Sequence, residues 1–321
     1  IIDIGVYEQN SCANFSGIVY VDANATGNNS GLNWTNAFTE LESALSIQEC
    51  ADVTEIRVAT GTYRPSGFRT CSDCDVTIHG QRENYFLLTE DIVLKGGYNP
   101  ETNNQVGLSK LDGALLNGDT CFNILITKGL STAAQIDGFV FQNGLSDVDL
   151  DRTIAQSVIS RENGAAMVNV SSSPTVTNCV FANNYAGEFG TVTNTSSQGS
   201  FTNCVFTNNI SLGFASGVFS YESDLKIVNC TFANNSAAPA VTLLASSTGI
   251  LQNCVFYGND GDIFTLASSI DFSSSNNYAE SVTHSSFSTL SSNPFINSAT
   301  PEGPDGDFGT ADDGLFPAVG S

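Results

Sequence analysis

Four short segments of this chain repeat one pattern of apolar residues, asparagines and a cysteine. They read PTVTNCVFANN, GSFTNCVFTNN, LKIVNCTFANN and GILQNCVFYGN, at residues 174–184, 199–209, 225–235 and 249–259. The cysteines stand at positions 179, 204, 230 and 254, so successive copies are 25, 26 and 24 residues apart. A fixed period of roughly 20–50 residues indicates a chain that stacks one supersecondary unit on the next.

Within each copy the cysteine and a phenylalanine are two positions apart, which places both on one face of a β-strand. The residue between them is β-branched and points to the opposite face: Val180, Val205, Thr231 or Val255. A further apolar residue precedes each cysteine by three positions: Val176, Phe201, Ile227 or Leu251. Because an odd offset cannot keep two side chains on one face of a continuous strand, the chain must bend between them. Each bend contains an asparagine: Asn178, Asn203, Asn229 or Asn253.

Short strands with bends, a period near 25 residues and no helix between copies predict an all-β parallel β-helix, in which each repeat forms one coil. The asparagines at the second turn should form an internal ladder, because Asn tolerates the left-handed conformation and its amide can bond the next coil. These residues are Asn184, Asn209, Asn235 and Asn259. We expect the four repeat cysteines to be interior free thiols, because stacked side chains keep their sulfurs about one coil apart.

An apolar stripe at helical spacing precedes the repeats, at Trp34, Phe38, Leu41 and Leu45. The stripe predicts a short N-terminal helix, and its candidate N-caps are Asn33, Thr35 and Asn36. A solenoid needs an atypical terminal unit to cover its exposed core, so we interpret this helix as a cap. The predicted division is a leading strand and linker (1–17), the cap with its helix (18–52), the parallel β-helix (53–293) and an acidic closing segment (294–321).

The charge balance excludes several classes of partner. Ten Lys and Arg stand against 33 Asp and Glu, which gives a net charge of −23. Nucleic acids, polyanionic substrates and anionic membranes all require a cationic surface, so we expect none of them as partners. No apolar run reaches the length of a membrane span, and we therefore expect no membrane insertion.

Five cysteines lie outside the repeats, and the sequence leaves their pairing open: Cys12, Cys50, Cys71, Cys74 and Cys121. Cys71 and Cys74 form a CSDC in a polar stretch. A zinc knuckle would need a second pair close by, and a redox CxxC would need a thioredoxin-like helix; neither can be read here. We interpret the pair as a loop staple, joined either to each other or to Cys12 or Cys50.

The closing segment contains the best candidate metal site of the chain. Asp305, Asp307, Asp312 and Asp313 lie within GPDGDFGTADDG, where glycines permit a tight wrap around a cation. Clustered carboxylates suit Ca²⁺, which takes six to eight oxygen ligands, although the closing Glu of an EF-hand is missing. A second acidic run, DVDLD at residues 147–151, lacks the Gly and Glu that a calcium loop needs.

Several segments together resemble a known group of proteins. YVDANATGNNSGLNWTNAFTELESAL, IRVATGTYRP and YFLLTEDIVLKGGYNPET are similar to the amino-terminal part of secreted right-handed β-helix proteins of the Bacteroidetes. These pectin-lyase-like solenoids often belong to very large surface proteins exported by the type IX system. SNPFINSATPEGPDGDFGTADDGLFPAVGS resembles the segment that closes such a domain, and IIDIGVYE resembles the segment that normally comes after such an ending. The resemblance implies a bacterial cell-surface location and contacts with other modules or copies of the same protein.

Parallel β-helices also include pectate lyases and polygalacturonases, so an enzyme has to be considered. Elimination from a polyuronate needs an Arg or Lys base, and Lys226 is the only basic residue in 164–321. Hydrolysis needs converging carboxylates, and the few acidic residues of the regular coils fall mostly at turns. His79 and His284 are far apart in sequence. We therefore expect no enzyme but a structural or adhesive module; the alternative is a carbohydrate-active β-helix that binds neutral surface glycans or, less readily, a lyase or hydrolase.

Overall fold

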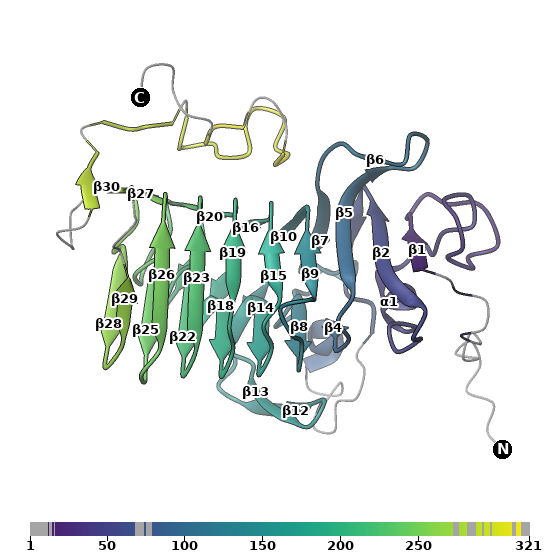
Figure 1. Ribbon diagram of the computed structural model, residues 1–321, viewed down its shortest axis with the longest axis horizontal. Coiled ribbons are helices and arrows are strands. Elements are labelled where there is room, and N and C mark those ends of the chain that lie inside the picture. Colours follow the sequence, from purple (N-terminus) through teal and green to yellow (C-terminus); the bar gives the residue numbers. More distant parts are fainter. Residues whose placement is uncertain are drawn as a thin grey trace.

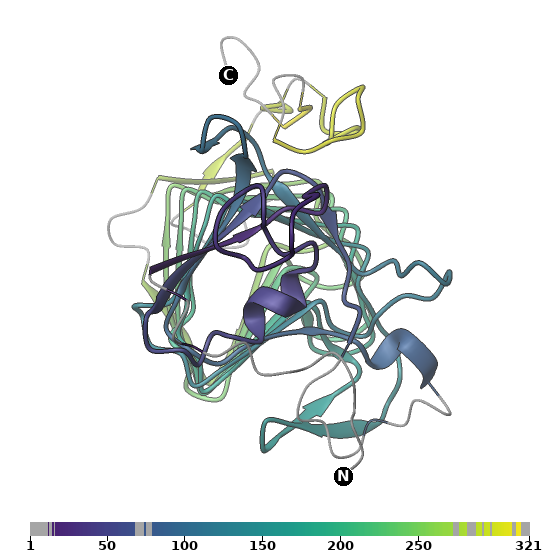
Figure 2. The ribbon, with the colours of Figure 1, turned by 90° about the vertical axis from the view of Figure 1, so that its right-hand side faces the viewer.

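The computed structural model describes residues 12, 15, 17–67, 74, 79–271, 276–280, 287–290, 292–295, 297–309 and 313–315. Over these ranges the chain winds into a tube whose walls are three parallel sheets (Figures 1 and 2). Each coil from β2 to β28 contributes one strand to each wall, so strands adjacent in a sheet belong to successive coils. The predicted parallel β-helix is confirmed.

The three walls take their strands in a fixed order along the chain. The first sheet contains β1 (Gly17–Val21), β2 (Val53–Ala59), β5 (Val93–Asn99), β9 (Gln135–Asp137), β15 (Thr175–Thr177), β19 (Ser200–Thr202), β23 (Asp224–Val228), β26 (Thr248–Gln252) and β29 (Ser269–Asp271). The second contains β3 (Thr62–Tyr63), β7 (Ser109–Asp112), β10 (Phe139–Gln142), β16 (Val180–Ala182), β20 (Val205–Thr207), β24 (Thr231–Ala233), β27 (Val255–Tyr257), β30 (Asn277–Ala279) and β31 (Phe287–Thr289). The third contains β4 (Phe86–Leu88), β8 (Leu125–Lys128), β14 (Asn163–Val170), β18 (Gly190–Thr195), β22 (Val218–Tyr221), β25 (Val241–Leu244) and β28 (Ile263–Leu266).

Several shorter strands lie outside the three walls of the tube. A short fourth ladder is formed by β11 (Leu145–Ser146), β17 (Tyr185–Ala186) and β21 (Ile210–Ser211). β6 (Asn104–Gln105) pairs antiparallel with β5. An antiparallel hairpin, β12 (Asp151–Ile154) and β13 (Ser157–Ser160), projects beside the third sheet (Figure 2).

The register of the first two sheets is the one that the repeats predict. Val176, Phe201, Ile227 and Leu251 stand in line on β15, β19, β23 and β26. On the second sheet the phenylalanines of the four repeats stack on Phe141 of the preceding coil. Their rings are nearly parallel, with successive centroids 4.9, 4.7, 4.6 and 4.8 Å apart: Phe141, Phe181, Phe206, Phe232 and Phe256. The spacing matches that of neighbouring strands, so one phenylalanine per coil fills the tube continuously.

The internal asparagine ladder is also confirmed. The side-chain oxygen of Asn209 accepts both the backbone N–H and the amide N–H of Asn184, each at 3.0 Å. The same pair of bonds links Asn209 to Asn235 and Asn235 to Asn259. Every rung therefore satisfies a buried backbone donor of the coil before it, which would otherwise be costly.

The left-handed backbone lies one residue earlier than predicted. Asn183, Asn208 and Asn234 have φ values of 57°, 53° and 56°, and Gly258 has 64°. The ladder asparagines are not among the positive-φ residues, because their side chains must point inward to bond the next coil. The bends before the cysteines do use asparagine in this conformation, with φ between 51° and 55° at Asn178, Asn203, Asn229 and Asn253.

Two further polar ladders line the interior, and the sequence analysis predicted neither. At the corner between the third and first sheets, the backbone N–H groups of Ser172, Ser197 and Ser223 each donate to the serine hydroxyl of the next coil at 3.1 Å. The accepting hydroxyls belong to Ser197, Ser223 and Ser247. Along the third sheet a second series of side-chain bonds joins Thr127, Asn169, Asn194 and Ser220. The inner face of the third sheet therefore combines an apolar column, which joins the main core, with a hydrogen-bonded polar column.

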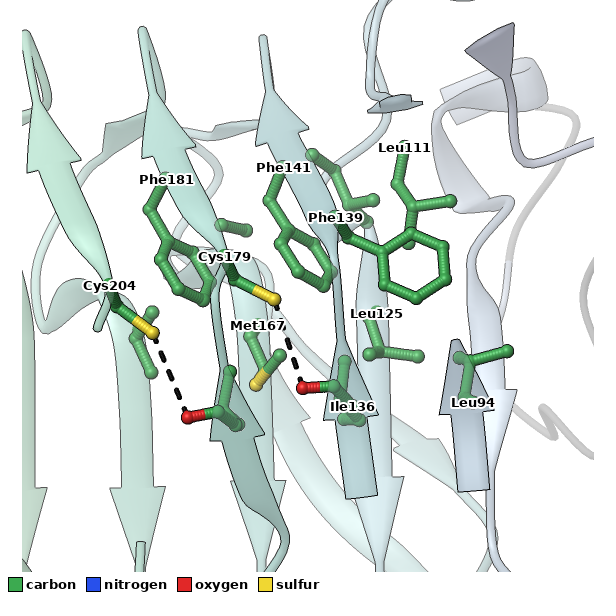
Figure 3. Packing of buried hydrophobic residues seen from close by; sticks show 14 of the residues in the cluster. Leu94, Leu111, Leu125, Ile136, Phe139, Phe141, Met167, Cys179, Phe181 and Cys204 are labelled. Carbon is green, nitrogen blue, oxygen red and sulfur yellow. Dashed lines mark hydrogen bonds between the residues drawn. The ribbon is translucent and has the colours of Figure 1, made fainter. Parts of the chain in front are cut away.

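The repeat cysteines are buried free thiols, as predicted. Figure 3 shows the thiols of Cys179 and Cys204 pointing toward carbonyl oxygens of the preceding coil. Burial raises the pKa of Cys179 and of Cys254 to about 12, and it raises the pKa of Cys230 well above the usual value. These sulfurs are small apolar fillers rather than reactive groups.

A short α-helix, α1 (Leu41–Leu45), lies across the amino-terminal opening of the tube (Figure 2). Leu41, Ala44 and Leu45 join the main core, which confirms a short capping helix. The predicted extent of the helix was wrong, however, because Phe38 pairs with Val21 in a β-bridge and its backbone bonds Tyr20 and Asp22. Strand pairing at the edge of the first sheet thus overrides the helical spacing.

The expected N-caps of this helix were wrong as well. Glu40 precedes the first turn in an extended conformation and makes no side-chain cap. Asn33 instead accepts the backbone N–H of Asn36 in a separate turn. Trp34 packs against Tyr20 and Tyr98, with ring centroids 4.8 and 5.9 Å away, on the outside of the first sheet. The tryptophan therefore covers a wall instead of the tube end.

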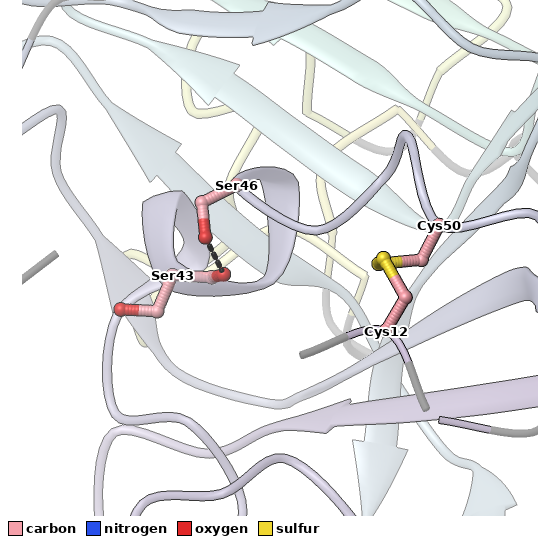
Figure 4. The surroundings of a disulfide bond; sticks show 4 residues. All are labelled: Cys12, Ser43, Ser46 and Cys50. Atoms are coloured by element: carbon pink, nitrogen blue, oxygen red, sulfur yellow. Dashed lines mark hydrogen bonds between the residues drawn. A yellow bond between two sulfur atoms is a disulfide. The ribbon is translucent and has the colours of Figure 1, made fainter. Parts of the chain in front are cut away.

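A disulfide fastens the chain beside this cap. Cys12 is joined to Cys50, shortly after α1 (Figure 4). Neither of them is therefore available to the CSDC pair. Cys74 is also disulfide-bonded, whereas Cys71 lies outside the described residues. Cys121 is a buried free thiol whose pKa burial raises to about 12.

Two insertions of the first half form a lobe beside the third sheet. The hairpin β12–β13 buries Ile154 and Ile159 against Ile126 and Val168 of the third sheet. Behind it, Glu83 at the end of a 3₁₀ helix, η2 (Gly80–Glu83), is fully buried and binds two arginines. Its carboxylate lies 2.6 Å from Arg152 and 2.8 Å from Arg161. The two insertions are thus held together by a buried ionic triad.

The closing segment folds back along the outer face of the second sheet (Figure 1). Phe295 packs edge-on against Tyr257 at 6.0 Å, and Phe308 is buried with Val140, Val180 and Ala182. The segment therefore runs from β27 back past β16 and β10. It covers part of the outward valine column that the repeats place on this face.

Candidate functional site

The aspartates predicted to bind calcium have hydrogen-bonding roles in the closing segment. Asp305 accepts the backbone N–H of Asp307 at 2.9 Å, and Asp313 accepts that of Gly309 at 2.8 Å. Asp307 also pairs with Lys110 of β7, which ties the segment to the second sheet. One cation is thus already supplied to this turn by the solenoid itself.

The fourth aspartate of the predicted site, Asp312, lies outside the described residues. Within the ranges that the structure describes, no three His, Cys, Asp or Glu side chains are grouped so that they could hold a metal. Calcium binding by the closing segment therefore stays a prediction.

The other polar candidates also have local partners. Asp147 of the DVDLD loop forms an ion pair with Arg82. Burial, followed by repulsion from Asp149 and Asp147, raises the pKa of Glu162. The ring of His79 packs edge-on against Phe122 at 5.4 Å, and His284 lies outside the described residues. These contacts join the first-half insertions to one another and bring together no acid–base pair.

A cavity of about 510 Å³ opens beside the capping helix. Four segments that are distant in sequence form its walls: residues 39–42, 62–66, 81–84 and 115–117. They belong to the start of α1, to β3 with the residues after it, to η2 with the residue after it, and to the loop between β7 and β8. Its volume is within the range of small-molecule sites, roughly 300–1,000 Å³.

Glu42 is the most perturbed acidic group of this cavity. Burial raises its pKa to about 7, although the backbone N–H of Ser66 donates to the carboxylate and opposes the shift. Repulsion from Glu40, on the same rim, adds to the increase. A carboxyl that titrates near neutral pH in a cavity is a recognised sign of a functional site.

Arg64 supplies the one positive charge among the described residues of the lining, and it is already engaged. Its guanidinium donates to the carbonyl of Ala114 at 2.7 Å and lies 3.2 Å from the carboxylate of Asp112. Asp112 is largely buried, so this pair is a fixed part of the wall. The arginine therefore does not neutralise Glu42, and it does not appear among the causes of the Glu42 shift.

A second feature is an aromatic surface on the outside of the third sheet. Phe189 stacks on Phe214 with centroids 5.5 Å apart, and both contact the ring of Phe219 on β22. Further along this face Tyr221 and Phe264 are 40% and 45% exposed. Outward columns of a sheet alternate with inward ones, so these side chains share one outer surface.

The aromatic surface could have been predicted from the sequence, whereas the cavity around Glu42 could not. Phe189 and Phe214 each follow a repeat cysteine by ten residues, so their stacking could have been predicted from the period. No such signal marks Glu42, which sits between apolar residues of the cap. Its environment arises only when segments 20 to 75 residues away close around it.

Comparisons with known proteins bear on the fold. Among the described residues no helix has the length and apolar character that a membrane crossing requires. Searches of curated proteins and of solved structures gave no match to this chain. Residues 131–279 match the family model of the right-handed beta helix region, and together with the three stacked parallel sheets this match shows that the fold is a right-handed parallel β-helix.

Proposed function

We propose that this chain is a non-catalytic module of a larger extracellular protein, in which a rigid solenoid acts as a spacer and presents its side surfaces for attachment. The observation that carries the proposal is the interior of coils 174–259, where phenylalanine, asparagine and serine ladders run without interruption. The asparagine and serine ladders accept backbone N–H groups of the preceding coil, and the phenylalanine ladder fills the interior. Both effects favour stiffness along the axis.

The disulfides support an extracellular location. Cys12–Cys50 and the bonded Cys74 require an oxidising compartment in most organisms. The net charge of −23 favours solubility and disfavours anionic surfaces. The resemblance to Bacteroidetes surface proteins leads us to propose other modules or copies of the same protein as partners, at the bacterial cell surface.

Three of the four buried Asp and Glu side chains among the described residues are engaged by structural partners, which supports a role without catalysis; the fourth is Asp262. Glu83 binds two arginines and Asp112 binds Arg64. Asp137 accepts hydrogen bonds from the side chains of Thr177 and Asn178, the first of the four bend asparagines. Carboxylates engaged in this way hold loops in place and are not free for acid–base work.

We expect no turnover of polygalacturonate. The purified domain with Ca²⁺ should show neither the ultraviolet absorbance of unsaturated products nor an increase in reducing sugars. Lys226 is the only basic residue beyond 163, so an anionic polymer would meet a repulsive surface along the regular coils. Turnover that disappears when one side chain is replaced would contradict a non-catalytic module.

A second candidate function is attachment to neutral glycans, which the exterior aromatic surface favours. Stacked rings with exposed faces can pack against the apolar faces of sugar rings. Phe214 is 38% exposed and Tyr221 is 40% exposed on this surface. Tyr221 lies on β22, and Phe214 lies in the connection just before it, where its ring packs against Phe219 of that strand, so these rings would meet a saccharide with little ordering cost.

Replacement of Phe214 by alanine should weaken binding of neutral oligosaccharides at least about fivefold, or ~1 kcal/mol. Titration calorimetry with a panel of uncharged oligosaccharides measures the loss. Val158→Ala is the matched control, because Val158 is 67% exposed on the hairpin but lies outside the aromatic surface. Equal affinities for Phe214→Ala and the unmodified domain would rule out this surface as the glycan site.

A further inference from the structure

The cavity beside α1 has a composition that is unusual for a gap between loops. One part of its lining is apolar, with Leu41, Tyr63 and Leu115, while Gln81 and Asn84 add amide groups. Apolar walls with a few convergent polar groups are typical of small-molecule sites. Leu116 at the rim is 91% exposed, which leaves a large apolar side chain available at the entrance.

The charges around the cavity are unevenly distributed. Its described lining contains three ionisable side chains, Glu40 and Glu42 from the start of α1 and Arg64 from the chain after β3. The lining residues from η2 and from the 115–117 loop are uncharged. Because Asp112 compensates Arg64 from behind, the two glutamates leave the described lining with an excess of negative charge.

The excess negative charge makes the ionisation of Glu42 unfavourable, and a bound cation would remove this cost. Glu42 is partly desolvated and repelled by Glu40, and both effects disfavour its ionised form. An ammonium group placed beside the two carboxylates would favour ionisation and gain a charge-assisted hydrogen bond. An anionic group would be repelled, and a neutral hydroxyl would gain only an ordinary hydrogen bond.

We infer that the cavity between α1, η2 and the 115–117 loop binds a small hydroxylated amine, with the ammonium at Glu42 and Glu40 and the hydroxyls toward Gln81, Asn84 and Asn117. The aliphatic backbone of such a molecule would lie against Leu41 and Leu115. The ligand class is thus an amino polyol or amino sugar. This site is separate from the aromatic surface of the third sheet, and its failure would leave the proposed structural role intact.

The inference predicts a specific order of affinities among three ligands of matched shape. Glucamine, sorbitol and gluconate share a six-carbon hydroxylated chain and carry an ammonium, no charge and a carboxylate. Titration calorimetry with the full chain should detect glucamine, at least about tenfold weaker binding of sorbitol, and no binding of gluconate. A tenfold difference corresponds to about 1.4 kcal/mol, within the range of one charge-assisted hydrogen bond.

The pH dependence gives a second, independent readout. Glu42 must be ionised to bind the ammonium, and its pKa in the free protein is about 7. Affinity for glucamine should therefore fall about tenfold between pH 8 and pH 6, since the amine stays protonated throughout and the ionised fraction of Glu42 falls by that factor. Proton release on binding at pH 7, measured in buffers of different ionisation enthalpy, should accompany it.

The Glu42→Gln variant should lose at least tenfold in glucamine affinity and lose the pH dependence. Glu49→Gln removes the same charge from an exposed position just beyond α1, outside the cavity lining, and should bind as the unmodified chain does. Glu40→Gln should give an intermediate loss and serves if Glu42→Gln does not fold. Equal binding of sorbitol and glucamine, preference for gluconate, no glucamine binding at millimolar concentration, or an unchanged affinity in Glu42→Gln would each overturn the inference.

Discussion

Replacement of Phe206 by alanine is expected to lower the free energy of unfolding by about 3–5 kcal/mol. The ring is fully buried and stacks between Phe181 and Phe232, with centroids 4.7 and 4.6 Å away. Its edge also contacts Phe201 of the same coil at 5.8 Å. Removing it would leave a cavity in the middle of a continuous column, where rigid coils on both sides limit collapse. Urea denaturation followed by far-ultraviolet circular dichroism measures the loss.

Phe264→Ala is the matched control for this substitution. It deletes the same atoms from the outer face of the third sheet, where Phe264 is 45% exposed. The expected loss is below about 1 kcal/mol, because little apolar area leaves a packed environment. If the two variants were destabilised equally, the stacked column would not be the source of the stability of the regular coils.

Replacement of Glu83 by glutamine should be almost as damaging, at about 3–5 kcal/mol. Glu83 is fully buried and its two oxygens bind Arg152 and Arg161 at 2.6 and 2.8 Å. Without the negative charge, two guanidinium groups remain in a place that water does not reach. The loss should appear as a lower midpoint in thermal and urea unfolding, and the hairpin β12–β13 should become sensitive to protease first.

The control for the ionic triad is Glu55→Gln. Glu55 pairs with Arg57 at 2.7 Å, but both side chains are 19% exposed and lie on the outer face of the first sheet. Removing an ion pair in contact with water should cost no more than about 1 kcal/mol. Replacing all three buried members with apolar residues, as Glu83→Leu with Arg152→Met and Arg161→Met, should recover most of the loss. A triple variant as unstable as Glu83→Gln would show that packing rather than charge is the cause.

The repeated coils were predictable from the sequence because each side chain meets its own equivalent. In a parallel solenoid the register is set by the period, so the position of Phe181 dictates that of Phe206 and Phe232. The same logic placed the cysteines inside and formed the ladder through Asn184 and Asn209. Local pattern and tertiary contact carry the same information in this region.

The serine ladder could not be predicted from the period alone. Ser197 and Ser223 occur in serine-rich turns where neighbouring serines look alike, so the sequence does not reveal which one points inward. The backbone decides it, because left-handed residues at Ser196 and Glu222 turn the following side chain into the tube. The coil before the repeats departs from the repeated pattern, because Gly138, with φ of 79°, occupies the position of the bend asparagine Asn178.

The predicted extent of the capping helix was wrong for a different reason. Trp34 and Phe38 have helical spacing with Leu41, but β1 offers Phe38 a backbone partner at the edge of the first sheet. A strand edge that would otherwise be unpaired competes with a helical turn, and tertiary pairing wins over local propensity. The helix is left with Leu41–Leu45, the part that the tube opening can bury.

By itself the sequence determined the parallel solenoid, its coil boundaries in 174–259 and the identity of the stacked columns, because these depend on periodicity. The right hand of the solenoid was implied by the resemblance to known β-helix proteins and agrees with the family match of residues 131–279. Only the tertiary structure decided what lies outside the period. Glu83 meets Arg152 and Arg161 across 69 and 78 residues, and Glu42 enters a cavity whose walls come from four separate segments. Such contacts depend on where irregular loops end in space, and no repeat carries that information.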